Sequence, residues 1–344
     1  FLDPTIQYPP GLLDLVRKDF ALNARGIYYH QFYKPMFVKS SRSIWIPTLE
    51  DLNWNDPREA DRRRRARRFA EHNRNNELWK KSEYPWDADA WSDVFGQIRD
   101  DPYLTMDKHG YHTFKKKTDA IRCTLTGESK IIHRIPDITF GLATFSDHQS
   151  PAFVEQLHQD TLERVLLHPK CGLLADPHWG RTQLAFPFAV YEAKGWDGDC
   201  RTARRQACLA AATYLDLLDN LARTPGPKEN YEKRVYQTST SHKYQVFALT
   251  SFGAHWHVLV GYRRPRVDNS TTCGTDWWYQ EPNEFAGRED MSDTVYVFQR
   301  IWSGRIVTEM KAWELLSIVD QIHNWAISEH RAFVLGHLKS WQKF

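Results

Sequence analysis

The fold is decided by one segment, Phe186-Pro187-Phe188-Ala189-Val190-Tyr191-Glu192-Ala193-Lys194-Gly195. Residues 186–191 are apolar and rich in aromatic side chains, which is typical of a buried β-strand. The run then ends in an acid-x-lysine triplet. Because side chains alternate along a strand, Glu192 and Lys194 are predicted to point to the same face. The segment therefore predicts a buried strand that presents two charged groups at its end.

A second strand-like run, residues 131–140, carries Asp137 directly after Pro136. Proline suits the start of a strand, where a missing N–H is tolerated. If the two strands pair, Asp137 and Glu192 supply two carboxylates, and the backbone carbonyl of Ala193 adds a third oxygen. Such an all-oxygen site with open positions suits Mg²⁺ or Mn²⁺. The metal would polarise a phosphoryl oxygen while Lys194 positions the attacking water, so the pattern predicts a metal-dependent nuclease.

An acid-x-lysine triplet alone is a weak signal, because two others occur, at 128–130 and 309–311. The first lies at a turn marked by Gly127. The second precedes a helical pattern. Only Glu192 ends an apolar strand, has an acid on another strand upstream, and is followed by a helix with a capping residue. We therefore expect the triplet at 192–194 to be the functional one.

Strand and helix signals along the chain indicate an α/β fold with a three-layer core. Strands are predicted at about 119–125, 130–135, 137–144, 184–191, 244–250, 255–262 and 294–302, and the first three could form a meander. Helices are predicted at 87–99, 150–167, 199–223 and 305–335. In the first of these helices, Asp87 is expected on the apolar inward face and Asp89 and Asp93 are not.

Residues 1–85 are interpreted as a mainly helical N-terminal extension, and residues 86–344 as the main domain. The extension contains a helix at about 56–81 that begins with Asp56-Pro57 and carries four consecutive arginines, Arg62, Arg63, Arg64 and Arg65. These arginines could contact phosphates or direct nuclear import. Alternatively, interspersed acids such as Glu59 make this a solvated helix held by salt bridges.

Composition sets broad limits on the function. The chain has 344 residues, 41% hydrophobic and 26% charged, which is ordinary for a soluble globular protein. No apolar run reaches the length of a membrane span, so no membrane association is expected. Five scattered cysteines favour a reducing, intracellular compartment, although a secretory signal before residue 1 stays open because the sequence begins without Met. Nothing in the sequence indicates an oligomeric state.

The motif Pro136-Asp137 … Glu192-Ala193-Lys194 resembles the PD-(D/E)xK nuclease superfamily, and its flanking residues are similar to fungal PD-(D/E)xK nuclease-like proteins. The resemblance covers roughly 87–337. It implies a restriction-endonuclease-like core, a central mixed sheet flanked by helices, and cleavage of DNA more than RNA with Mg²⁺ or Mn²⁺. It also implies an acid from the first helix, for which Asp87 is the candidate, and a glutamine from the helix after the lysine, which Gln206 matches.

The sequence departs from that family in one respect, because a helix and a loop at about 150–182 separate Asp137 from Glu192. Asp147 and Asp176 are therefore alternative metal ligands. Formal net charge is only +3, so nucleic-acid binding would need local basic clusters. Beside Gln206, such a cluster is formed by Arg201, Arg204 and Arg205. The alternative function is a catalytically silent descendant that binds nucleic acid or a protein partner.

Overall fold

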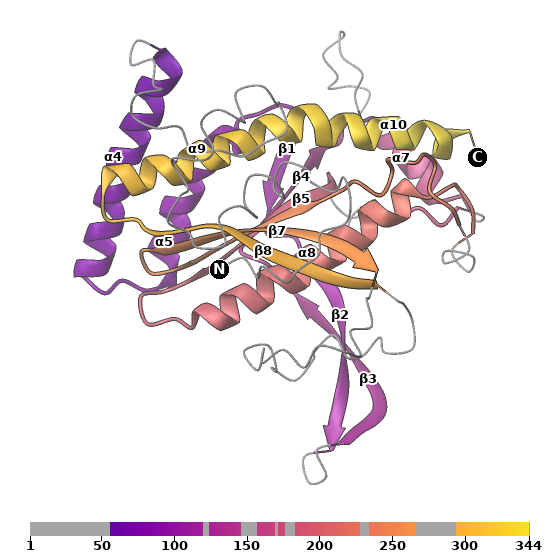
Figure 1. Cartoon of the computed structure of the whole chain (residues 1–344), viewed down its shortest axis with the longest axis horizontal. Coiled ribbons are helices and arrows are strands. Elements are labelled where there is room, and N and C mark those ends of the chain that lie inside the picture. The colour runs from indigo at the N-terminus through magenta and orange to yellow at the C-terminus, as the bar shows by residue number, and fades with distance from the viewer. Residues whose placement is uncertain are drawn as a thin grey trace.

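A computed structural model describes residues 56–119, 124–145, 157–168, 171–175, 183–227, 234–265 and 294–343. Its centre is a six-stranded mixed sheet with the strand order β1-β4-β5-β6-β7-β8 (Figure 1). The strands are β1 (Leu104–Asp107), β4 (Ile138–Ala143), β5 (Leu184–Lys194), β6 (Val246–Phe252), β7 (His255–Pro265) and β8 (Thr294–Arg305). Only β5 and β6 run parallel among these described strands. The predicted α/β class is confirmed.

Helices lie on both sides of this sheet (Figure 1). Helix α8 (Cys200–Ala222) crosses one face and makes the connection between the parallel strands β5 and β6. It begins where the sequence predicts, because the Asp199 carboxylate accepts hydrogen bonds from the backbone N–H groups of Arg201 and Thr202. The other side carries α9 (Glu309–Trp325), the π-helical turn Ala326–His330 and α10 (Arg331–Gln342).

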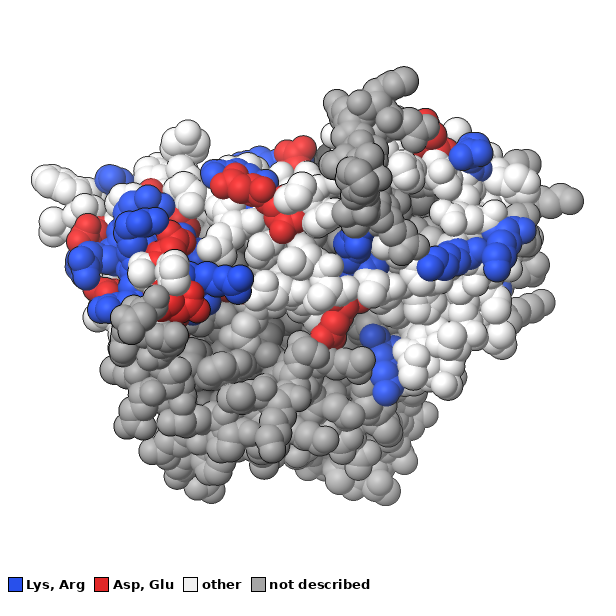
Figure 2. All heavy atoms as spheres, turned by 90° about the horizontal axis from the view of Figure 1, so that it is seen from above, with Lys and Arg blue, Asp and Glu red and all other residues white. Residues whose placement is uncertain are grey.

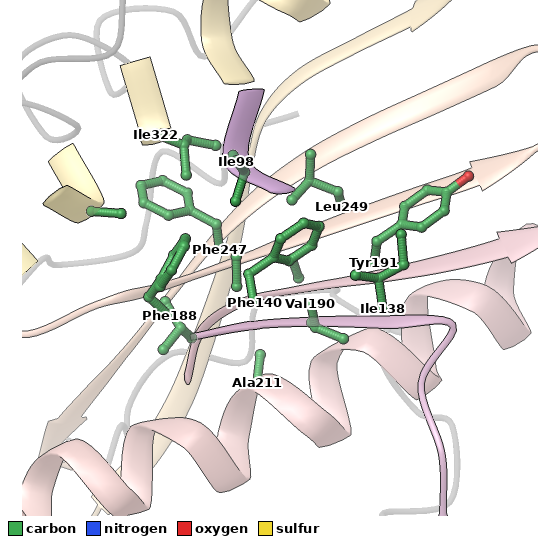
Figure 3. Packing of buried hydrophobic residues seen from close by; sticks show 14 of the residues in the cluster. Ile98, Ile138, Phe140, Phe188, Val190, Tyr191, Ala211, Phe247, Leu249 and Ile322 are labelled. Atoms are coloured by element: carbon green, nitrogen blue, oxygen red, sulfur yellow. The ribbon is translucent and has the colours of Figure 1, made fainter. Parts of the chain in front are cut away.

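Aromatic residues fill the layer between the sheet and α9 (Figure 3). Phe140, Phe188, Tyr191 and Phe247 are each at most 1% exposed. The T-shaped and tilted contacts among such rings add to the burial of their apolar area. Opposite them, Ala211 of α8 faces the other side of the sheet. Strand β5 is therefore buried on both faces, as the apolar run at 186–191 predicts.

Helix α4 (Pro57–Leu78) packs along α9 and shares the same hydrophobic cluster. Its Phe69 ring meets the ring of Trp256 from β7 edge-on, at 5.7 Å between centroids. The predicted start of this helix is confirmed, because Asp56 caps it. A domain boundary at residue 85 stays a prediction, but α4 contributes directly to the core of the residues that follow it.

The predicted meander is wrong in its first two strands. The run at 119–125 covers the end of β2 and the start of β3, with 120–123 outside the described part, and the run at 130–135 falls at the end of β3. Strands β2 (Tyr111–Asp119) and β3 (Thr124–Arg134) pair with each other in a separate hairpin that projects from the body of the protein (Figure 1). In the main sheet β4 pairs with β5 on one side and, on the other, with β1, which was not predicted. Local apolar patterns mark strands but do not identify their partners, and a four-residue strand is too short to show a pattern.

Two predicted helices also differ from the structure. The helix expected at 87–99 is divided into α5 (Glu83–Asp89), a π-helical turn at Ala90–Val94 and α6 (Gly96–Arg99). The helix expected at 150–167 is described only as α7 (Gln159–Leu166), because residues 146–156 lie outside the described part. Asp147 and Asp176 also lie outside it. None of the described helices has both the length and the apolar character needed to cross a membrane.

Candidate active site

The two strands that carry the predicted acids are direct neighbours in the sheet. Ile138 of β4 lies opposite Tyr191 of β5, so the antiparallel register places Asp137 beside Glu192. The Asp137 carboxylate also accepts a hydrogen bond from the backbone N–H of Ala193 at 2.7 Å. The intervening segment of the chain therefore does not prevent the pairing on which the site depends.

Glu192 is a buried acid, with 4% of its surface exposed. Burial, with the nearby Asp137 carboxylate, raises the pKa of Glu192 to about 8, although Lys194 and Arg134 act in the opposite direction. A carboxyl group in this position is held away from water and close to a second acid. A bound cation would favour its ionised form.

Lys194 reaches back toward the beginning of α5. Its Nζ lies 3.3 Å from Glu83 Oε1 and donates a hydrogen bond to the Ala193 carbonyl at 2.6 Å. The Ala193 carbonyl, predicted as a metal ligand, therefore accepts a hydrogen bond from Lys194 in this structure. Glu83 was missed in the sequence because the helix was expected to begin later, although an acid directly after Ser82 is a typical start of a helix.

A close backbone approach holds α5 against the end of β5. A Cβ atom added to Gly195 would lie 3.2 Å from the backbone nitrogen of Glu83 and 3.6 Å from the Ser82 carbonyl carbon. A glycine at this position therefore lets the first turn of α5 reach Lys194.

Asp87 comes from the next turn of α5 and faces the same cluster. Its Oδ2 accepts a hydrogen bond from Lys108 Nζ at 3.3 Å, whereas its Oδ1 is buried without a hydrogen-bond partner. Burial raises the pKa of Asp87, and the charges of Asp137 and Glu83 add to this effect, against Lys108. A buried carboxylate oxygen without a donor is open to a cation or an ordered water.

The expectation that Asp93 points outward is wrong. Its side chain is only 1% exposed and accepts hydrogen bonds from Arg68 at 2.6 Å and from His72 at 2.8 Å, in the protonation state where that ring nitrogen donates. The π-helical turn at 90–94 inserts one residue into the helical repeat, so the regular spacing on which the expectation rested does not apply. Asp87 and Asp93 consequently belong to different clusters.

The second cluster, His72, Asp89 and Asp93, has the geometry of a metal site. Their ligand atoms lie within 4.8 Å of one another, and no other three His, Cys, Asp or Glu residues do so in the described part of the chain. However, Arg68 binds one Asp93 oxygen and Asn76 donates to Asp89 at 2.6 Å. These two donors already occupy one oxygen of each carboxylate.

Gln206 and the neighbouring arginines lie on the first turns of α8. The Gln206 Oε1 atom is buried without a hydrogen-bond partner, and its backbone carbonyl accepts from the Tyr111 hydroxyl at 3.3 Å. Arg201, Arg204 and Arg205 are exposed. Among the described residues, no hydrogen bond joins Gln206 to the acids at the end of β5, so its role stays a prediction.

The arginines of α4 are engaged in ion pairs with acids of the same protein. Arg62 and Arg65 both reach Asp320 of α9, at 2.7 and 3.0 Å. Further pairs join Arg62 to Glu59, Arg64 and Arg65 to Asp61, Arg63 and Arg67 to Glu309, and Arg68 to Asp93. Basic and acidic side chains accordingly lie interspersed at this end of the molecule (Figure 2). The interpretation as a helix held by salt bridges describes this arrangement, and phosphate contact by these arginines stays a prediction.

Comparisons with known proteins add no relative to this description. The chain matches no protein-family model, no curated protein and no solved structure.

Proposed function

We propose that this protein is a metal-dependent nuclease whose site is formed by Asp137, Glu192 and Lys194. The observation that carries the proposal is the convergence of two acids and a lysine at one end of adjacent strands, joined by Glu83 and Asp87 from α5. Buried carboxyl groups with a raised pKa, such as Glu192 and Asp87, that lie close to lysines are typical of catalytic sites. In an ordinary salt bridge at the end of a strand, Glu192 would be exposed, whereas it is 4% exposed.

The order of elements around the site supports the finer fold assignment. A helical segment precedes β1, β4 and β5, which form an antiparallel meander, and α8 then leads to β6 beside β5 in parallel. We propose that this is a restriction-endonuclease-like core, in which the hairpin of β2 and β3 is inserted between the first two strands. The carboxylates then lie at one end of the adjacent antiparallel strands β4 and β5.

The donor set fits a hard divalent cation. Asp137 and Glu192 offer carboxylate oxygens, and Asp87 offers a buried oxygen without a hydrogen bond. Mg²⁺ usually takes one or two carboxylates and keeps several waters, so a set of three closely spaced ligands is not required. When bound, Mg²⁺ or Mn²⁺ would supply Lewis-acid polarisation of the phosphoryl group. Lys194 would hold the attacking water, and Glu83 would keep the ammonium group in place.

Cleavage assays test the proposal. Wild type is expected to cut plasmid or oligonucleotide DNA with Mg²⁺ or Mn²⁺ but not with a chelator. Lys194→Ala and Glu192→Gln should each lose roughly 100-fold or more in rate. Glu309→Gln is the matched control, because Glu309 also begins an acid-x-lysine triplet but pairs only with α4 arginines among the described residues. Equal rates for wild type and the two site variants would refute the assignment.

Metal binding is tested separately from activity. Electron paramagnetic resonance of Mn²⁺ should show an affinity loss of about tenfold or more in Asp137→Asn. Asp93→Asn, which alters the rival cluster on α4 and α5, should leave Mn²⁺ affinity unchanged. The reverse result would place the metal at His72, Asp89 and Asp93. Nucleic-acid binding without cleavage under any metal would instead favour the catalytically silent alternative, which the existing bonds of Lys194 allow.

A further inference from the structure

The turn between α4 and α5 exposes large apolar side chains next to the candidate site. Leu78, Trp79 and Tyr84 are 74%, 72% and 78% exposed, and Trp196, two residues after Lys194, is 46% exposed. Exposed tryptophan and tyrosine residues gathered at one place are uncommon on a soluble domain and usually mark a binding surface. The proposed catalytic chemistry makes no use of them.

This surface is continuous with the site. The backbone at Gly195 lies against Ser82 and Glu83, as described above, and Lys194 is bonded to Glu83. The Trp196 backbone also lies close to the backbone of Gly253, where an added Cβ would be 3.3 Å from the Trp196 Cα. The exposed aromatic groups therefore begin within two residues of the lysine that is proposed to position the attacking water.

Positive charges are interleaved with these aromatic rings. The Lys80 ammonium group lies over the Trp196 ring, 5.1 Å from its centroid, and Lys81 is also exposed. Lys80 has a φ of 46°, in the left-handed region that a lysine seldom adopts. This tight turn directs the chain from α4 into α5 and places Lys80 beside the exposed end of β5.

We propose that Trp79, Tyr84 and Trp196 form a stacking platform for unpaired bases of a nucleic acid, with Lys80 and Lys81 holding its backbone. Aromatic rings alternating with cations are the usual means of binding single strands, because every base has a face on which a ring can stack. In a duplex those faces are already covered by neighbouring bases. The platform thus deepens the proposed nuclease function, on which it rests, by assigning a substrate with a single-stranded segment at the cleaved position.

Binding measurements in the presence of a chelator test the platform without relying on cleavage. The probes are a fluorescently labelled single-stranded oligonucleotide and the same sequence as a blunt duplex. Wild type is expected to prefer the single strand. Trp196→Ala and Trp79→Ala should each weaken single-strand binding roughly five- to a hundredfold, the effect of removing one base–aromatic stack. Tryptophan fluorescence should be quenched by the single strand, and less so in each variant.

Leu167→Ala is the matched control, because Leu167 is 80% exposed but follows α7. It should bind as wild type does, and Trp196→Phe should retain most of the affinity. Unaltered circular dichroism and melting would show that the alanine variants remain folded. Loss of single-strand binding in the variants supports the platform even if no metal supports cleavage, so the two proposals fail separately. Equal affinity of wild type and Trp196→Ala for the single strand would overturn the proposal. It would also be overturned if wild type bound no oligonucleotide and instead self-associated in a way that Trp196→Ala abolished.

Discussion

Helix α4 and the end of strand β5 are both densely charged, and they differ in how that charge is neutralised. Along α4, each arginine from 62 to 68 lies within ion-pair distance of an acid. At β5, four acids and the cations Lys194, Lys108 and Arg134 lie close together, and burial raises the pKa of Asp87 and Glu192. The conspicuous run of arginines is used for packing, whereas two of the less conspicuous acids have a perturbed pKa. Acids whose pKa the fold perturbs are a better indicator of a ligand site than charge density.

The largest expected effect tests whether α4 is held by its ion pairs. Asp320→Asn leaves Arg62 and Arg65 without their common carboxylate in a largely buried position. We expect a loss of about 3–5 kcal/mol in the free energy of unfolding, measured by urea denaturation. Asp61→Asn removes a more exposed carboxylate, which binds Arg64 and Arg65, and should cost less than about 1 kcal/mol because Arg65 keeps Asp320. Similar small losses in both variants would mean that α4 does not depend on this network.

The next effect tests the raised pKa of Glu192 in β5. The folded protein keeps the Glu192 proton up to about pH 8, whereas the unfolded chain releases it above its ordinary value of 4.5. The stability of metal-free wild type should therefore fall between these pH values, relative to Glu192→Gln, by up to about 5 kcal/mol. Denaturation with a chelator at several pH values measures this. A constant difference between wild type and Glu192→Gln would contradict the raised pKa.

The smallest expected effect is a change in salt dependence. It tests whether the lysines at 80–81 or the arginines at 63–64 contact nucleic acid. The double variant Lys80→Gln/Lys81→Gln should make the slope of log affinity for the single strand against log salt concentration shallower, by roughly 0.7 for each lost phosphate contact. Arg63→Gln/Arg64→Gln should leave this slope unchanged, because these guanidinium groups are held by Glu309 and Asp61. Titrations at several salt concentrations measure both. A reduced slope in the arginine variant would establish α4 as a nucleic-acid contact.

Features of the fold that depend on local pattern could be predicted from the sequence. The apolar run at 186–191 is buried strand β5, and Asp199 caps α8 where expected. In each case, neighbouring residues carry the information.

Features that depend on contacts between distant residues could not be predicted. Strand β1 is too short to show a pattern, and the hairpin of β2 and β3 looks the same in sequence as strands of the main sheet. Glu83 joins the site only because α5 folds back onto β5, and Lys194 is 111 residues away from it in the chain. Asp93 was placed on the wrong face because a π-helical turn breaks the regular repeat.

The site also depends on Gly195, a residue that takes no part in the proposed chemistry. The distance between α5 and β5 is set there by a missing side chain, since even a methyl group would press against the Glu83 backbone at 3.2 Å. A descendant with alanine at 195 would retain every acid and the lysine, yet its helix would have to move away by a few tenths of an ångström. An inactive descendant of this kind would still carry Asp137, Glu192 and Lys194. Only the residue at 195 would differ.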